Sequence, residues 1–196
     1  MEEGDVNKYR MVVIGGSAGS LDVILKIVAA VQDAADVAFI VVVHRAKTGD
    51  SILADLLSTQ TKLAVKEVED KEQILPGTIY IAPPDYHLLL ENEYTFSLDA
   101  SEKVHYSRPS IDVTFESAAL VYKTTLVGIL LSGANADGAA GIKTIADAGG
   151  YTIVQQPATA EVSYMPQRAL SIARVSKVLE GEEIGGFLNK ILNVKS

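Results

Sequence analysis

Three residues that could together perform nucleophilic catalysis lie at or just after the ends of apolar runs of the chain. Ser17 follows MVVIGG, His44 ends VAFIVVVH, and Asp137 lies in SGANADGAAG after LVGILL. In an open parallel sheet, ligands bind beyond the carboxyl ends of the strands, so these residues would share one edge. A serine nucleophile, a histidine base and an acid that orients the histidine can together hydrolyse an ester.

The segment GGSAG at residues 15–19 fits G-x-S-x-G, in which small residues allow a sharp turn that exposes a serine hydroxyl. It does not fit a phosphate-binding loop, because G-x-G-x-x-G requires glycine at Ser17 and Ser20, and no GK[ST] follows. Structural alternatives remain. Ser17 could cap the next helix, Asp137 could cap the helix in GAAGIKTIADAGG, and His44 could be a buried histidine with satisfied ring nitrogens.

Short runs rich in Val and Ile recur along the chain, and helix-period segments separate most of them. The runs are RMVVIGG, VAFIVVVH, GTIYIAP, TTLVGILLSG, GYTIVQQ and ARVSKVLE. This alternation predicts an α/β fold with a doubly wound, mostly parallel open sheet, Rossmann-like and in three αβα layers. The segment HLLLENEYTFSLD at residues 87–99 predicts an antiparallel hairpin on the sheet.

Two helices near the candidate residues have recognisable signals. SLDVILKIVAAVQDA, at residues 20–34, predicts an amphipathic helix. Its expected buried face comprises Leu21, Ile24, Leu25, Val28 and Val31. SRPSIDVTFESAA predicts a surface helix in which Pro109 suits the first turn and Ser107 is a candidate cap. Asp112 and Glu116 would lie one turn apart on it.

Composition restricts the possible functions. The 196 residues are 48% hydrophobic, without a linker or repeat, so we expect a single domain over residues 1–196. The formal net charge of −8 disfavours nucleic acid and anionic lipid as partners. No apolar stretch approaches the roughly 20 residues that span a bilayer, and the N-terminal segment is too polar for a signal peptide, so we expect a cytoplasmic protein. With no cysteine and three scattered histidines, we expect no metal site.

Four blocks resemble the catalytic domain of the CheB-type chemotaxis protein-glutamate methylesterases, from about Arg10 to the C-terminal helix. The blocks are IGGSAGS with Ser17, VVVHRA with His44, YSRPSIDVTFESAA, and GILLSGANADGAAGI with Asp137. The segments PGTIYIAPPDYHLLL and MPQRAL also resemble family segments. This resemblance implies that Ser17 is the nucleophile, His44 the general base and Asp137 the acid that orients it.

The resemblance also implies a reaction and a partner. Family enzymes hydrolyse glutamate methyl esters on chemoreceptor helices, releasing methanol, and some deamidate glutamine; no metal or organic cofactor is implied. Ala18, Ala134 and Asn135 are candidates for the oxyanion site or substrate cleft, and Arg108 for lining the cleft or fixing its own loop. Family members usually carry an N-terminal receiver domain, but the first apolar run begins near residue 11, so we expect none in residues 1–196.

The chain departs from the family pattern in three places. The family usually has Ser-Thr-Gly-Gly where residues 17–20 read SAGS, a Met-Pro pair after the histidine where this chain reads RAKTGDS, and methionine where Ala134 stands. Two other hypotheses remain: a Rossmann-like binder of a nucleotide or other anion at the GGSAGS turn, and a catalytically degenerate adaptor that docks on receptors. His87 and His105 are expected to be solvated or structural. The sequence leaves the oligomeric state open.

Overall fold

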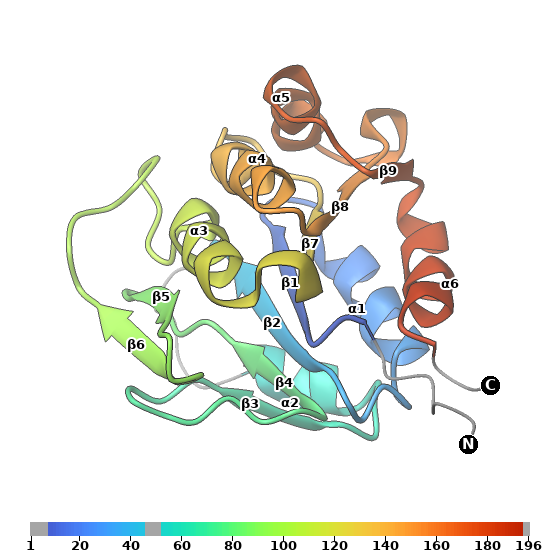
Figure 1. The fold of residues 1–196 in the computed structure, drawn as a ribbon. Helices are drawn as coiled ribbons and strands as arrows, with labels where there is room; N and C mark the ends of the chain where they lie inside the picture. Colours follow the sequence, from blue (N-terminus) through green and yellow to red (C-terminus); the bar gives the residue numbers. More distant parts are fainter. Residues whose placement is uncertain (1–7, 46–51, 194–196) are drawn as a thin grey trace.

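The computed structural model describes residues 8–45 and 52–193, and its centre is a parallel sheet (Figure 1). The strands of this sheet are β1 (Met11–Gly16), β2 (Ala38–Val43), β3 (Ala64–Glu67), β4 (Thr78–Ile81), β7 (Leu126–Leu130), β8 (Tyr151–Gln155) and β9 (Lys177–Leu179). Their spatial order is β3-β4-β2-β1-β7-β8-β9, and every neighbouring pair is parallel. The predicted mostly parallel, open sheet is therefore confirmed.

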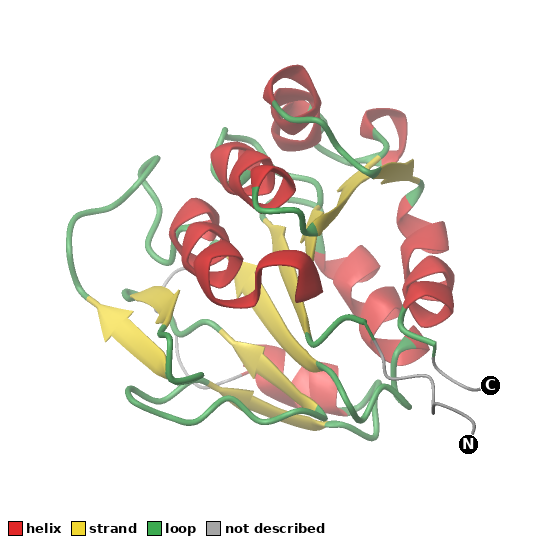
Figure 2. Ribbon diagram, viewed as in Figure 1, coloured by secondary structure: helices red, strands yellow, loops and turns green. Residues whose placement is uncertain are grey.

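Helices cover both faces of the sheet (Figures 1 and 2). One face carries α1 (Leu21–Ala30), α2 (Ile52–Ser58) and α6 (Gly181–Ile191), and the other carries α3 (Ile111–Tyr122), α4 (Ala139–Asp147) and α5 (Tyr164–Ile172). Two short 3-10 helices span Lys123–Thr125 and Pro157–Thr159. Strand side chains alternate between two cores, and because both faces are buried, the central strands read as continuous apolar runs. The three αβα layers are as predicted.

The predicted hairpin consists of β5 (His87–Leu90) and β6 (Phe96–Asp99), which pair antiparallel. It forms a separate two-stranded sheet rather than an extension of the large one. It is fixed to α3 by two buried hydrogen bonds: the Leu90 N–H donates to the Ser117 hydroxyl, and the Thr114 hydroxyl donates to the Leu88 carbonyl. The hairpin therefore holds α3, the helix whose N-terminus lies at the candidate site.

The buried face of α1 differs from the expected one. Val23 and Ile27 are buried with Ile24 and Val28, whereas Leu21 is 42% exposed. The helix packs against α6 as well as against the sheet, and most of its positions are apolar, so periodicity alone did not select the face.

The start of α3 also differs from the prediction. The helix is capped by Ser110, whose hydroxyl accepts a hydrogen bond from the Val113 N–H at 3.3 Å. Pro109 precedes this cap, and Ser107 lies further upstream. Asp112 is buried, so α3 is not a surface helix in its first turn.

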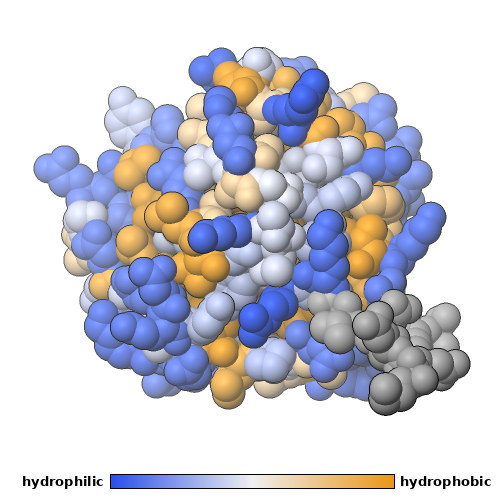
Figure 3. All heavy atoms as spheres, in the orientation of Figure 1, coloured by the Kyte–Doolittle hydropathy of each residue, from blue (hydrophilic) through white to orange (hydrophobic). Residues whose placement is uncertain are grey.

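The outer surface is mixed in polarity. On the face shown in Figure 3, hydrophilic side chains lie among smaller apolar groups. Within residues 8–45 and 52–193, no helix has the length and apolar character needed to cross a membrane.

Candidate active site

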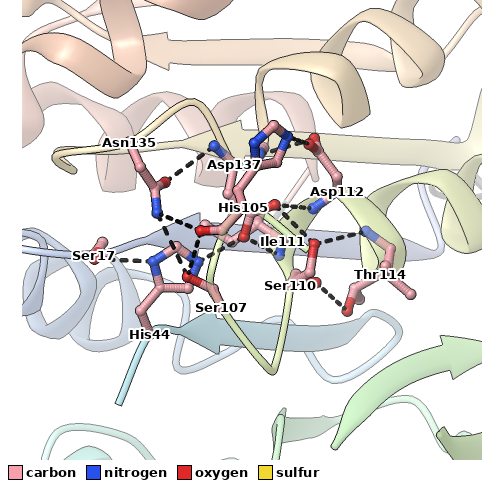
Figure 4. Close-up of polar contacts among 12 residues, drawn as sticks. Ser17, His44, His105, Ser107, Ser110, Ile111, Asp112, Thr114, Asn135 and Asp137 are labelled. Carbon is pink, nitrogen blue, oxygen red and sulfur yellow. Dashed lines mark hydrogen bonds and ion pairs between the residues drawn. The ribbon is translucent and has the colours of Figure 1, made fainter. Parts of the chain in front are cut away.

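The strand order places the three predicted residues on neighbouring strands. Ser17 directly follows β1, His44 directly follows β2, and Asp137 lies in the loop between β7 and α4. Since β1 lies between β2 and β7, the three side chains meet at one edge of the sheet (Figure 4). The chain adds β2, β4 and β3 on one side of β1, and β7, β8 and β9 on the other side. Open α/β sheets commonly bind ligands at such a switch point in the strand order.

Hydrogen bonds join the three side chains into one chain. His44 Nδ1 lies 3.1 Å from Ser17 Oγ, and His44 Nε2 lies 2.6 Å from Asp137 Oδ2. In the tautomer with the proton on Nε2, the imidazole donates to Asp137 and leaves the Nδ1 lone pair facing the serine hydroxyl. This arrangement can remove the serine proton and stabilise the resulting imidazolium.

A tight turn presents Ser17. The Ser17 N–H donates to the Ser132 carbonyl at 2.8 Å, which extends the pairing of β1 and β7 by one step. The Ser17 carbonyl accepts from the Ser20 hydroxyl at 2.7 Å, and Gly19 has a φ of +75°. The cap of α1 is Ser20, so Ser17 does not cap that helix. Its hydroxyl is left to His44.

Asp137 is buried and accepts four hydrogen bonds. Besides His44, the donors are the Ser110 hydroxyl at 2.8 Å, the Ile111 N–H at 2.7 Å and the Asp112 N–H at 3.0 Å. Burial alone would raise the pKa of Asp137, but these hydrogen bonds outweigh it and hold the pKa below its usual range. Asp137 is therefore an ionised group at the start of α3, not the cap of α4.

The backbone N–H groups of Ala18 and Ala134 are the candidates for holding an oxyanion. Ala18 follows β1 and Ala134 follows the adjacent β7. Among the described residues, neither N–H has a hydrogen-bond acceptor. Asn135 is differently placed: its amide nitrogen donates to the His105 carbonyl at 3.4 Å, and its amide oxygen accepts from the Asp137 N–H at 3.0 Å (Figure 4). The Asn135 side chain thus links two loops of the site.

A cavity of about 450 Å³ opens beside the histidine. It is lined by His44, Arg45, Asp85, Lys103, Tyr106, Ser107 and Arg108. Arg108 lies at this cavity while donating to the carbonyls of Ala100 at 2.9 Å and Ser101 at 2.8 Å, which ties its loop together. Arg45 is held by Glu67 at 2.6 Å. Arg45 begins the segment RAKTGDS, which differs from the Met-Pro pair that is usual in the family. The rest of this segment, residues 46–51, lies outside the described residues.

The other two histidines have different surroundings. His87 is buried, with Nε2 2.8 Å from the Glu102 carbonyl and Nδ1 accepting from the Ser110 N–H at 3.1 Å, as expected of a structural histidine. His105 Nε2 lies 3.3 Å from Asp112 Oδ2 at the surface of the site. In the described parts of the chain, no group of three His, Cys, Asp or Glu side chains is placed to hold a metal ion.

The sequence analysis missed two residues that support this arrangement. Ser110 was not recognised as a partner of Asp137, and the buried hydroxyl of Ser132, which donates to the Ala18 carbonyl at 2.7 Å, was overlooked. A serine directly before the helix in PSID and one directly after LVGILL were the available signals.

Comparison with known proteins finds relatives along most of the chain. A family model described as CheB methylesterase matches residues 12–188. A protein of Leptospira interrogans is 42% identical over 176 residues, which cover 90% of this chain and 91% of that protein. A Carboxydothermus hydrogenoformans relative, named protein-glutamate methylesterase/protein-glutamine glutaminase 1, is 36% identical over 88% of this chain and 52% of its own length. The crystal structure of the Thermotoga maritima CheB methylesterase catalytic domain matches with a TM-score of 0.87 and 32% identity, over 95% of this chain and 99% of that one.

Proposed function

The chain belongs to the CheB methylesterase family, and we propose that Ser17, His44 and Asp137 are the catalytic triad with which it hydrolyses glutamate methyl esters on chemoreceptors. The observation that carries the proposal is the continuous hydrogen-bonded chain from Ser17 through His44 to Asp137. Each link of that chain has the donor and acceptor that serine-hydrolase chemistry requires.

The first half of the reaction forms an acyl-enzyme. Ser17 Oγ attacks the ester carbonyl carbon while its proton passes to His44 Nδ1, and the N–H groups of Ala18 and Ala134 hold the oxyanion. The tetrahedral intermediate collapses when the bond to the methoxy oxygen breaks. His44 returns the proton to that oxygen, and methanol leaves.

The second half regenerates the enzyme. Water loses a proton to His44 as its oxygen attacks the acyl carbon, and the bond to Ser17 Oγ then breaks with return of the proton to the serine. The product is a free glutamate carboxyl group. The same steps applied to a glutamine side chain release ammonia, which agrees with the double name of the relatives.

The buried charge of Asp137 has a defined role in both halves. It holds the Nε2–H of the neutral imidazole and then stabilises the cation that forms after each proton transfer. The cavity beside His44, with Tyr106 98% exposed at its lining, is the part of the surface on which a receptor helix would approach the reacting ester.

Active-site labelling tests the triad against the two other hypotheses. A fluorophosphonate should form a covalent adduct on Ser17 of the wild-type protein and none on Ser17→Ala. A nucleotide or anion binder, or a degenerate adaptor, would leave both proteins unlabelled. A thermal shift caused by nucleotide in an unlabelled protein would favour the binder.

A further inference from the structure

We propose that Asp112 is a positioning residue for Asp137, fixing the loop that carries the catalytic acid and placing a second negative charge behind it. This inference rests on the proposed triad, but it concerns a carboxylate that touches neither Ser17 nor His44. The two aspartates belong to different segments, one inside the first turn of α3 and the other just before α4.

The hydrogen bonds of the two aspartates are reciprocal. Asp112 Oδ1 accepts from the Gly138 N–H at 2.8 Å and from the Gly141 N–H at 2.7 Å, at the beginning of α4. Asp137 accepts from the Ile111 and Asp112 N–H groups, at the beginning of α3. The Asp112 carboxylate therefore lies at the N-terminus of α4, and the Asp137 carboxylate lies at the N-terminus of α3. At both positions, backbone N–H groups stabilise negative charge. Gly138 follows Asp137 directly, so the hydrogen bond from the Gly138 N–H to Asp112 holds the catalytic acid in position.

Close packing of α3 and α4 brings Asp112 within hydrogen-bonding distance of Gly138 and Gly141. A Cβ atom on Gly141 would lie 2.6 Å from Phe115 Cβ, and one on Gly138, where φ is +97°, would lie 2.9 Å from Ile111 Cγ2; Phe115 and Ile111 both belong to α3. The short aspartate side chain spans the remaining gap between the helices. The arrangement is built for a carboxylate of this length.

The charges around Asp112 are few and identifiable. Its Oδ2 faces His105 Nε2 at 3.3 Å, and the negative charge of Asp137 is close enough to repel it. Burial, more than repulsion from Asp137, raises the pKa of Asp112 to about 6, so it is mostly ionised at neutral pH. The groups around His44 are Asp137 and the cavity-lining charges, which are Arg45, Asp85, Lys103 and Arg108.

Two consequences follow for catalysis. Loss of the Asp112 oxygen would leave the N–H groups of Gly138 and Gly141 without their acceptor and loosen the placement of Asp137. Loss of its charge alone would make the protonated state of His44 less favourable, since one nearby negative charge disappears. An amide oxygen can replace the acceptor but not the charge, so the two effects can be separated.

The test compares Asp112→Asn, Asp112→Ala and the control Ser117→Ala. Ser117 lies on the same helix and its buried hydroxyl accepts from Leu90, away from Asp137. Each variant of the 196-residue chain would be assayed for kcat, KM and pH dependence on a soluble glutamyl methyl ester, and for the rate of Ser17 labelling by a fluorophosphonate. The labelling rate reports triad assembly whatever the physiological substrate is.

We expect Asp112→Ala to lower kcat by about 10- to 100-fold with little change in KM, because the catalytic acid is displaced. Asp112→Asn should recover most of kcat, while the acid limb of its pH profile moves downward by about half a pH unit. Ser117→Ala should lose thermal stability without either kinetic change.

A wild-type pH profile in Asp112→Asn would overturn the proposal, as would wild-type kcat in a folded Asp112→Ala. If Asp112→Ala does not fold, the pH profile of Asp112→Asn decides alone. Failure of the proposed function would look different, because the wild-type protein itself would then show neither Ser17 labelling nor hydrolysis.

Discussion

Nε2 of His44 lies 2.6 Å from Oδ2 of Asp137, so the imidazole presents Nδ1 to the serine. In the serine-protease triad the nitrogens have the opposite assignment, with Nε2 at the serine and Nδ1 at the acid. Both arrangements satisfy the same requirement, because either ring nitrogen can donate while the other accepts. His44 and Asp137 come from strands on opposite sides of β1, so the imidazole lies between the serine and the acid.

The first prediction concerns the tautomer of His44. Because Asp137 is an acceptor only, the neutral imidazole should carry its proton on Nε2 and leave Nδ1 unprotonated. Nitrogen NMR of histidine-labelled protein above pH 8 distinguishes the two nitrogens, and Asp137→Ala provides the control. A resonance pattern with the proton on Nδ1 would contradict the arrangement.

The second prediction is that Asp137→Asn damages both activity and stability. Backbone N–H groups donate to each carboxylate oxygen, Asp112 to Oδ1 and Ile111 to Oδ2, so an amide NH₂ must face a donor whichever way it turns. We expect kcat to fall by about 10²- to 10⁴-fold and unfolding to become easier by about 1–3 kcal/mol.

Paired pH–rate and chemical-denaturation measurements check the Asp137→Asn prediction, with His44→Gln as the comparison that removes the base. Unchanged turnover in Asp137→Asn would remove Asp137 from the triad. Unchanged stability would show that the N–H groups at the start of α3 tolerate an amide in place of the Asp137 carboxylate.

The third prediction tests the turn that presents Ser17. Gly19 has a φ of +75°, and a Cβ there would lie 2.5 Å from Glu161 Cβ. Gly19→Ala should therefore destabilise the protein by about 1–2 kcal/mol and slow the labelling of Ser17. The matched control is Gly186→Ala in α6, where a Cβ meets nothing within 4 Å and alanine favours the helix. Equal melting temperatures for the two variants would contradict a strained turn.

The sequence was most informative where burial is complete. Strands such as β1 and β2 are covered on both faces and read as unbroken apolar runs, and the residues directly after them, Ser17 and His44, lie within hydrogen-bonding distance of each other. The strand β3 (Ala64–Glu67) escaped notice because it lies at the sheet edge, half exposed, and carries two charged residues.

Residues that act across the sequence were harder to predict. Ser107, Pro109 and Ser110 offer competing signals for the start of α3, and only packing selects Ser110. The pairing of Asp112 with the start of α4 depends on how closely two helices approach, which local sequence does not encode. The same holds for Ser132, whose partners lie in distant loops.

The fourth prediction is the pH dependence of stability contributed by Asp112. Its folded pKa of about 6 exceeds the usual 3.8, so the folded state binds the proton more tightly. The resulting stabilisation is fully present below about pH 4 and is lost as the pH rises through 6. Lowering the pH from 7 to 4 should therefore raise the unfolding free energy of the wild type, relative to that of Asp112→Asn, by up to about 3 kcal/mol. Denaturant titrations check this, and a difference that is flat with pH would contradict it.

The central claim is that Ser17 cleaves a glutamyl methyl ester, and the most direct measurement is methanol release from a methyl-esterified receptor fragment. Wild-type protein should release methanol in proportion to the free glutamate that forms, while Ser17→Ala, at the same melting temperature, should be slower by at least about a thousandfold. Methanol release by Ser17→Ala at the wild-type rate, or none from the wild-type protein, would contradict the account.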